Sequence, residues 1–402
     1  MQKFTSAFCS RNIYIIFFGA FLFLTGCSED NNPVAPVEEN KVLETNSLIK
    51  EIPKETILKS ATELSPLLTG FVKNGIKVYR ITYKTKNTDG ADIIASGALV
   101  LPVTDQAVSM ISVQHGTITE DSSAPSYFED NSEGASFGSL FGSLGYIIAY
   151  PDYIGYGASK DYPHPYEHRA SLASASLDML RASKEFLKDH AEVKWDQKLY
   201  VAGYSEGGYA TMCLQKKIEE EASSEFNLVA SSCGAGAYDK TAFMKYIINN
   251  TTSGVAGYNR SYLWVLLTYD RLYKLNQPTT YYFKEPFAAQ IAKLGFTNPI
   301  NQSFNTILND SFKKLLNDGT DTNFIKAIGD NDVYNWKPKT PTRLFHGDAD
   351  PLVFYFNSVN AVTAMKKLGA PNVELITVAG GTHGSSIDDF LLGTLTFFTT
   401  TK

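Results

Sequence analysis

A serine within a Gly-x-Ser-x-Gly pattern is the clearest candidate for chemistry in this sequence. The pattern is formed by Gly203, Ser205 and Gly207. An apolar run at 199–202 precedes it, and apolar residues at helical spacing follow over 210–218. This order predicts a strand, a tight turn and a helix, with a strained serine whose hydroxyl is exposed and with glycines where a side chain would collide. We therefore predict that Ser205 is a nucleophile.

A second copy of the same pattern shows that the letters alone are weak evidence. Gly134, Ser136 and Gly138 also match it, but they follow the polar stretch at 129–133. A loop before the serine does not build the strand-to-helix turn that exposes a nucleophile. We therefore do not assign Ser136 a chemical role.

The elements around Ser205 follow an order typical of α/β proteins. Residues 77–84 alternate as a half-buried strand, and a turn at 87–90 leads to a partner strand at 93–101. Short apolar strands separated by helical segments are then expected at 108–113, 146–150, 199–202, 228–231, 343–345 and 373–378. This alternation predicts an antiparallel edge followed by a parallel sheet with helices on both faces.

Six stretches together resemble the α/β-hydrolase superfamily and, within it, the secretory lipases and related bacterial esterases. They are QHG at 114–116, PDYIGYG at 151–157, HPY at 164–166, GYSEGG at 203–208, HGDAD at 346–350 and GGTHG at 380–384. The resemblance spans roughly residues 75–395. It implies an α/β-hydrolase fold in which a mostly parallel central sheet carries an inserted helical cap.

That fold orders its catalytic residues as serine, then Asp or Glu, then histidine. Only His346 and His383 follow Ser205. His383 lies on a Gly-Gly loop after the last expected strand, from which an imidazole can reach the serine, whereas His346 ends an apolar strand and is expected to fix its loop. We predict that His383 is the general base.

Two aspartates compete for the acidic position. Asp348 and Asp350 share the loop after the penultimate strand, and the HGxxD spacing of the resembled family falls on Asp350. Asp348 is expected to form the turn, and Asp239 is a third, weaker candidate. We expect Asp350 to accept a hydrogen bond from His383 and to stabilise its protonated form.

Ester hydrolysis on this fold also needs two backbone N–H donors for the oxyanion. The resembled fold assigns them to Glu206, the residue after the nucleophile, and to either Gly116 or Thr117. For Gly116 and Thr117, the alternative is that they only form the turn that ends the strand and donate no hydrogen bond to the oxyanion. For Asp152, Gly155 and Gly157 we favour a role in shaping a sharp loop over a role in lining the pocket.

The alternating pattern disappears between about residues 239 and 336. This segment is rich in aromatic residues, and we interpret it as a helical cap inserted over the strand ends. Some of its aromatic side chains would line an apolar pocket for acyl or aryl groups, and more than half would form the core of the cap itself.

The N-terminus resembles the signal of a bacterial lipoprotein. Residues 1–26 contain Lys3 and Arg11, no acidic residue, and a largely apolar stretch at 13–24. LTGC follows, with Cys27 at the lipidation position, and an ordinary signal peptide with an incidental cysteine is the alternative. We predict a signal peptide over 1–26, a flexible tether over 27–55 and a hydrolase domain over 56–402.

Charge and cysteine usage exclude several classes of function. Loss of Lys3 and Arg11 with the signal changes the formal net charge from −6 to −8, which argues against nucleic acid as a partner. Cys213 and Cys233 fall in segments expected to be packed, so we expect buried side chains and no disulfide. No Cys/His cluster suggests a metal, and no cofactor is expected.

These features predict a lipid-anchored serine esterase or lipase of the cell envelope, in the outer membrane and exposed at the cell surface, acting on a small ester substrate. A serine peptidase of the same fold is an alternative, although no charge cluster for a peptide terminus is evident. A ligand-binding surface lipoprotein without activity is another, but candidates for all three catalytic residues are intact.

Overall fold

The computed structural model describes residues 41–64 and 66–401, without the side chains of 61–68. The predicted signal segment and Cys27 lie outside these residues. None of the described helices combines the length and the apolar character needed to cross a bilayer.

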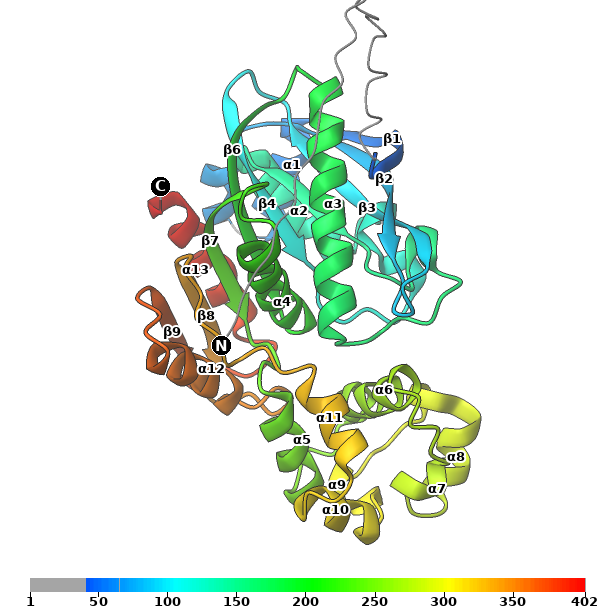
Figure 1. Ribbon diagram of the computed structural model, residues 1–402. Helices are drawn as coiled ribbons and strands as arrows, with labels where there is room; N and C mark the ends of the chain where they lie inside the picture. Colours follow the sequence, from blue (N-terminus) through cyan, green and yellow to red (C-terminus); the bar gives the residue numbers. More distant parts are fainter. Residues whose placement is uncertain (1–40, 65, 402) are drawn as a thin grey trace, which may run out of the picture. The chain divides into compact units, whose positions relative to one another are not determined.

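The described residues form a nine-stranded sheet in the order β1-β2-β3-β5-β4-β6-β7-β8-β9 (Figure 1). The strands are β1 (Leu43–Ile52), β2 (Ile76–Lys86), β3 (Asp92–Pro102), β4 (Ala107–Gln114), β5 (Ile147–Pro151), β6 (Lys194–Tyr204), β7 (Asn227–Gly234), β8 (Thr342–Gly347) and β9 (Val373–Val378). Pairing is antiparallel from β1 through β3 to β5 and parallel across all the strands from β5 to β9. The predicted antiparallel edge and mostly parallel sheet are confirmed.

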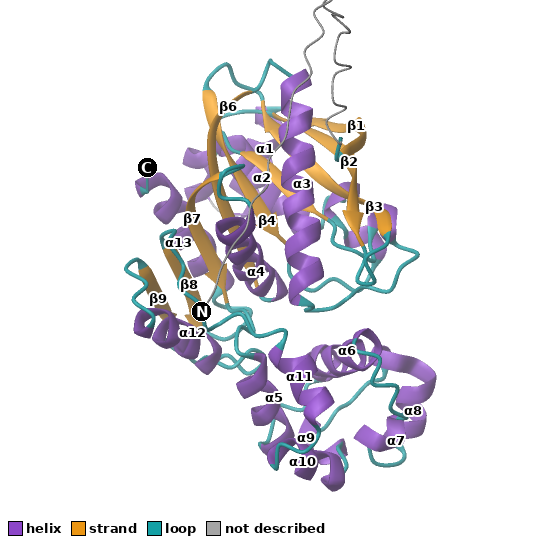
Figure 2. Ribbon diagram, viewed as in Figure 1, coloured by secondary structure: helices purple, strands orange, loops and turns teal. Residues whose placement is uncertain are grey.

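Helices cover both faces of the sheet (Figure 2). α1 (Lys54–Leu64), α2 (Glu133–Leu144) and α13 (Ile387–Thr400) pack on one face, and α3 (Arg169–Asp189), α4 (Glu206–Glu221) and α12 (Phe356–Lys367) pack on the other. Short 3₁₀ helices occur at Pro66–Phe71, Asp121–Ser123, Pro125–Tyr127, Gly157–Ser159 and Gly295–Thr297. The buried parts of the central strands are mostly apolar because both of their faces are covered.

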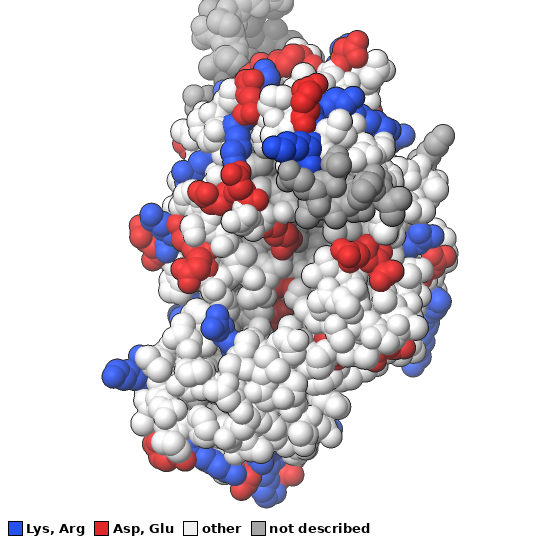
Figure 3. Space-filling model, turned by 180° about the vertical axis from the view of Figure 1, so that it is seen from behind, with Lys and Arg blue, Asp and Glu red and all other residues white. Residues whose placement is uncertain are grey.

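A group of helices, called here the helical insertion, separates β7 from β8. It comprises α5 (Lys240–Asn249), α6 (Ala256–Leu272), α7 (Thr279–Tyr282), α8 (Phe287–Leu294), α9 (Phe304–Ile307), α10 (Asp310–Asn317) and α11 (Thr322–Gly329). Its core holds Tyr282, Phe304, Phe312 and Phe324, all of which are buried. Seen from behind, its surface is largely uncharged, with charged side chains gathered at one end (Figure 3).

The predicted tether at 27–55 is wrong in its second half. β1 (Leu43–Ile52) pairs along β2, and the Glu185 carboxylate on α3 accepts hydrogen bonds from the Val42 and Leu43 N–H groups. β1 is an edge strand whose side chains are mostly exposed, so its sequence lacks the apolar alternation that marks a half-buried strand. Backbone pairing, which composition does not reveal, holds it in the sheet.

Candidate active site

Ser205 occupies the sharp turn between β6 and α4. Its backbone has φ 60° and ψ −123°, a conformation that L-residues rarely adopt. The turn is held by the Ser205 N–H, which donates to the Gly234 carbonyl at 2.9 Å, and by the Tyr209 N–H, which donates to the Ser205 carbonyl at 3.1 Å. The serine hydroxyl is therefore presented at the carboxyl end of the parallel strands.

Glycines allow this turn to pack against its neighbours. A Cβ on Gly203 would lie 2.4 Å from the Gly207 carbonyl oxygen, and one on Gly207 would lie 2.0 Å from the Gln114 carbonyl oxygen. Gly208, which the pattern does not include, is equally constrained, because its Cβ would lie 2.0 Å from the Gly234 oxygen. The steric reason predicted for Gly203 and Gly207 is confirmed.

The structure brings Ser205, His383 and Asp350 together in one hydrogen-bonded chain. His383 Nε2 lies 2.9 Å from Ser205 Oγ, and His383 Nδ1 lies 2.6 Å from Asp350 Oδ2. His383 follows β9 and Asp350 follows β8, so loops after adjacent parallel strands carry the two partners. This arrangement can move a proton from the serine to an imidazole that a carboxylate orients.

The Asp350 carboxylate is buried but fully engaged. Its Oδ1 accepts hydrogen bonds from the Leu352 and Val353 N–H groups at 2.9 and 3.0 Å. Burial raises the pKa of Asp350, but interactions with His346 and His383 outweigh that effect and bring the pKa down to about 2. Asp350 therefore stays ionised at neutral pH.

The competing histidine and aspartate near this chain have hydrogen-bond partners of their own, and His346 Nε2 also lies 3.3 Å from Asp350 Oδ2. His346 is buried, and its Nδ1 and Nε2 lie 2.7 Å from Ser358 Oγ and from the Val353 carbonyl oxygen. The Asp348 carboxylate accepts a hydrogen bond from the Gly380 N–H at 2.6 Å. Both residues thus fix loops, as the sequence suggested.

Asp239 and Ser136 have structural roles in two different helices. Asp239 caps α5 by accepting from the Ala242 N–H, and its second oxygen accepts from Asn360. Ser136 lies within α2, where its hydroxyl donates to the Ser132 carbonyl. Neither side chain joins the hydrogen-bonded chain at Ser205.

The two positions considered for the second oxyanion donor differ in the structure. The Gly116 N–H donates to Glu133 Oε2 at 3.1 Å, so it is already used. The N–H groups of Thr117 and Glu206 donate to no other residue in the part of the chain that the structure describes. Glu206 begins α4, whose N-terminus favours negative charge. Thr117 is therefore the better candidate beside Glu206.

The loop at Asp152, Gly155 and Gly157 serves the backbone and does not line the pocket described below. Both glycines have positive φ, at 98° and 58°, and a Cβ on Gly157 would lie 2.2 Å from an Asp152 oxygen. The Asp152 carboxylate accepts hydrogen bonds from Ser96 and from the Ser126 N–H. These contacts hold a sharp loop, as predicted.

Sequence reasoning missed two acidic side chains that support the site, Glu133 and the buried Glu206. Besides the Gly116 N–H, the Glu133 carboxylate accepts a hydrogen bond from the Tyr150 hydroxyl at 2.7 Å and so fixes the loop after β4. The Glu206 carboxylate lies 3.0 Å from His164 Nε2, while His164 Nδ1 lies 2.7 Å from a carbonyl oxygen. Because a carbonyl can only accept, Nδ1 must donate, and a further proton lies between His164 and Glu206. The HPY stretch at 164–166 was the only sequence signal for this pair.

Comparisons with known proteins identify the family of this chain. The model of the secretory lipase family matches residues 139–387, which is more than half of the sequence. The chain belongs to the secretory lipase family. Carboxylic ester hydrolysis is the activity that this membership indicates. No curated protein sequence matches the chain.

Several solved structures share the fold of this family member. A candidate hydrolase from Legionella pneumophila is 25% identical with a TM-score of 0.80, over 89% of this chain and 98% of that chain. The rice cell wall degrading esterase LipA from Xanthomonas oryzae is 23% identical with a TM-score of 0.74, over 87% and 94%. Candida antarctica lipase A in its closed state is 17% identical with a TM-score of 0.62, over 89% and 81%. The α/β-hydrolase fold predicted from the sequence is confirmed.

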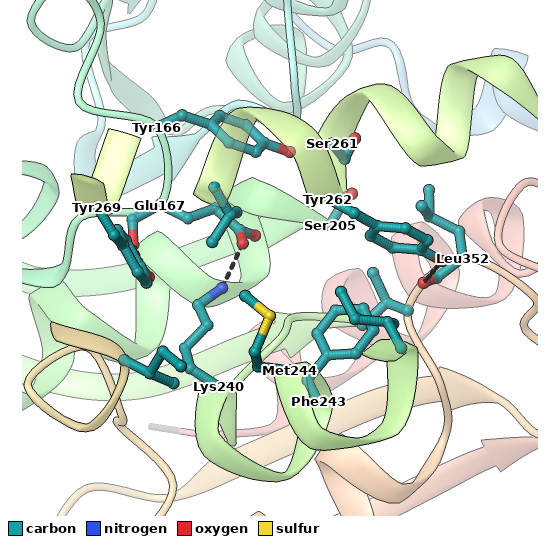
Figure 4. Close-up of a pocket in the computed structure, with 14 residues that line it drawn as sticks. Tyr166, Glu167, Ser205, Lys240, Phe243, Met244, Ser261, Tyr262, Tyr269 and Leu352 are labelled. Atoms are coloured by element: carbon teal, nitrogen blue, oxygen red, sulfur yellow. Dashed lines mark hydrogen bonds and ion pairs between the residues drawn. The ribbon is translucent and has the colours of Figure 1, made fainter. Parts of the chain in front are cut away.

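In this secretory lipase family member, a pocket opens beside Ser205 (Figure 4). Most of its lining comes from α5, α6 and neighbouring loops and is apolar or aromatic: Tyr166, Phe243, Met244, Ile247, Tyr262, Val265, Tyr269, Ile328, Leu352 and Val353. Its polar part consists of Glu167, Lys240 and Ser261 besides Ser205. The sequence indicated that aromatic residues of the 239–336 segment would reach such a pocket but not which ones.

The described part of the chain contains no arrangement of side chains suited to binding a metal ion or to thiol chemistry. No group of three or more His, Cys, Asp and Glu side chains there could hold a metal ion. Cys213 and Cys233 are buried and unpaired with each other, and burial raises the pKa of each thiol to about 12. Both cysteines therefore behave as small core residues.

Proposed function

We propose that this protein is a serine esterase or lipase that hydrolyses carboxylic esters through an acyl-enzyme on Ser205. The observation that carries the proposal is the hydrogen-bonded chain from Ser205 through His383 to Asp350, at 2.9 and 2.6 Å. Its occurrence in a secretory lipase family member, beside a largely apolar pocket, favours ester hydrolysis over peptide hydrolysis.

In the proposed reaction His383 Nε2 takes the Ser205 proton while Ser205 Oγ attacks the ester carbonyl carbon. The negative charge that develops on the carbonyl oxygen is stabilised by the Thr117 and Glu206 N–H groups. Asp350 accepts from His383 Nδ1 and stabilises the imidazolium. The imidazolium then protonates the leaving alcohol, and water, activated by His383, releases the acid from Ser205.

Ser205→Ala provides the decisive test. Turnover of 4-nitrophenyl butyrate should fall to the level supported by binding and the oxyanion donors alone, while thermal unfolding stays close to wild type. Ser136→Ala, which removes the serine of the other Gly-x-Ser-x-Gly match, is the control and should remain active. Retained turnover in Ser205→Ala would place the nucleophile elsewhere. Faster cleavage of the matched butyryl anilide than of the ester would instead favour the peptidase alternative.

We further propose that the protein is exported and that lipid on Cys27 holds it at the outer membrane. Membership of a secretory family supports export. The lipid anchor and the outer-membrane location rest on the LTGC sequence, whose cysteine follows the apolar stretch at 13–24. A mature N-terminus bearing more than one acyl chain would anchor stably.

A further inference from the structure

A buried ion pair lies within the otherwise apolar pocket. Lys240 Nζ donates to Glu167 Oε2, and the two side chains are only 3% and 8% exposed. Figure 4 shows them pointing toward one another. Lys240 also lies over the Tyr209 ring, with Nζ 3.9 Å from its centroid. Both charged groups line the same pocket as Ser205.

Burying this ion pair costs free energy that a pocket for an unsubstituted hydrocarbon chain would not require. Burial disfavours the charged form of Glu167 and raises its pKa, which Lys240 lowers only in part. Replacing a buried ion pair by apolar side chains is often neutral or stabilising. Glu167 also has φ 51°, the left-handed region, and its carbonyl is held by the Tyr269 hydroxyl at 3.0 Å. Retained strain of this kind points to a role in function.

The pair keeps hydrogen-bonding capacity that the described residues around it do not use. Glu167 Oε2 is used by Lys240, whereas Oε1 accepts no hydrogen bond from a described residue. The ammonium has three protons, of which one serves Glu167. A hydroxyl can donate to Glu167 and accept from Lys240 at once. A carboxylate would face Glu167, and an ammonium would face Lys240, so each would meet a like charge.

The pocket is suited to the acyl side of the ester. The leaving alcohol must receive its proton from His383, as in the proposed reaction. His383 does not line the pocket, although Ser205 does. The group that enters the pocket is therefore the one that stays on Ser205.

We propose that this pocket selects esters whose acyl group is apolar and aromatic but carries a hydroxyl, which is bound between Glu167 and Lys240. The inference rests on the proposed function and names its substrate class. Aromatic side chains from Tyr166, Phe243 and Tyr262 provide the surfaces for the ring. Glu167 and Lys240 are specificity residues of the same site.

The experiment compares 4-nitrophenyl esters of 3-phenylpropanoic acid and of its 3-hydroxy- and 4-hydroxyphenyl analogues. The leaving group is constant, and alkaline hydrolysis rates correct for intrinsic reactivity. The better hydroxyphenyl ester should have a kcat/KM roughly 10- to 100-fold above that of the parent ester, the range for a hydrogen bond to a charged group. Equal values, or a preference for the parent or for a long alkanoyl ester, would overturn the inference.

A double variant assigns the preference to the pair. Glu167→Leu with Lys240→Met removes both charges together, so no buried charge is left unpaired, and the preference for the hydroxyl should disappear. The control variant, Lys217→Met with Glu221→Leu, removes an ion pair on the surface of α4 and should retain the preference for the hydroxyl. A preference that survived in the Glu167/Lys240 variant would contradict the assignment. If that variant does not fold, the wild-type substrate ratio still decides.

Ser205→Ala separates this inference from the proposed function. Loss of activity on all three esters in that variant, together with no hydroxyl preference in the wild type, would reject the substrate class alone. Activity that persisted in Ser205→Ala would reject the proposed function.

Discussion

Asp350→Asn should abolish most of the activity while leaving the shape of the site intact. The Asp350 Oδ1 atom accepts from two backbone N–H groups, those of Leu352 and Val353. In the variant the amide oxygen keeps these bonds, so the amide NH₂ replaces Oδ2, 2.6 Å from His383 Nδ1. His383 Nδ1 must then accept, and the ring proton moves to Nε2, which faces Ser205. That tautomer cannot take the serine proton.

The magnitude follows from these contacts. Turning the amide to restore the productive tautomer would set its NH₂ against the two backbone donors, at a cost of roughly 2 kcal/mol for two lost hydrogen bonds. The variant also loses the negative charge that stabilises the imidazolium in the transition state. The same substitution in a well-studied serine protease lowers kcat about 10⁴-fold. A tenfold change equals about 1.4 kcal/mol, so we expect a barrier higher by about 5.5 kcal/mol.

The assay is steady-state hydrolysis of a 4-nitrophenyl ester, with kcat and KM measured separately. Asp348→Asn is the matched control, because an asparagine oxygen can still accept from the Gly380 N–H, and it should retain most of the turnover. Equal losses in the two variants would refute the reasoning about the tautomer. Activity that survived Asp350→Asn but collapsed in Asp239→Asn would move the acid to the start of α5.

The remaining predictions concern stability and location. The pKa of Asp350 falls from 3.8 to about 2 on folding, so its carboxylate stabilises the fold by about 2 kcal/mol above pH 4. That stability is lost as pH falls from about 4 to 2. The free energies of unfolding of wild type and Asp350→Asn, measured with urea, should therefore converge over this range. Gly207→Ala should lower the free energy of unfolding by about 3 kcal/mol or more, or prevent folding altogether. Gly257→Ala, whose added methyl group would meet open space beside α6, should leave the melting temperature unchanged or raise it. Cys27→Ala should move the protein from the membrane fraction to the soluble fraction on detergent partitioning, and a variant that stayed with the membrane would contradict lipid anchoring.

Local patterns in the sequence, together with the resemblance to a known family, predicted the fold and the candidate residues. Apolar runs of strand length, separated by helical segments, indicated a parallel sheet because strands buried on both faces must be continuously apolar. The glycines around Ser205 followed from steric demands of a single turn. His383 could be proposed from its place on the loop after the last expected strand, and Asp350 was preferred to Asp348 because the HGxxD spacing of the resembled family falls on it. Their catalytic roles remain predictions.

Only the tertiary structure decided what depends on contacts between distant segments. β1 joins the sheet by backbone hydrogen bonds to β2, which leave little trace in side-chain composition. Glu133 uses the Gly116 N–H and thereby favours Thr117 as a donor, a distinction that rests on one hydrogen bond between the loop after β4 and the start of α2. The Glu167–Lys240 pair joins residues on either side of the nucleophile turn. Sequence spacing carries no information about this pair, because Lys240 at the start of α5 meets Glu167 in the loop before α3 only when the helical insertion packs there.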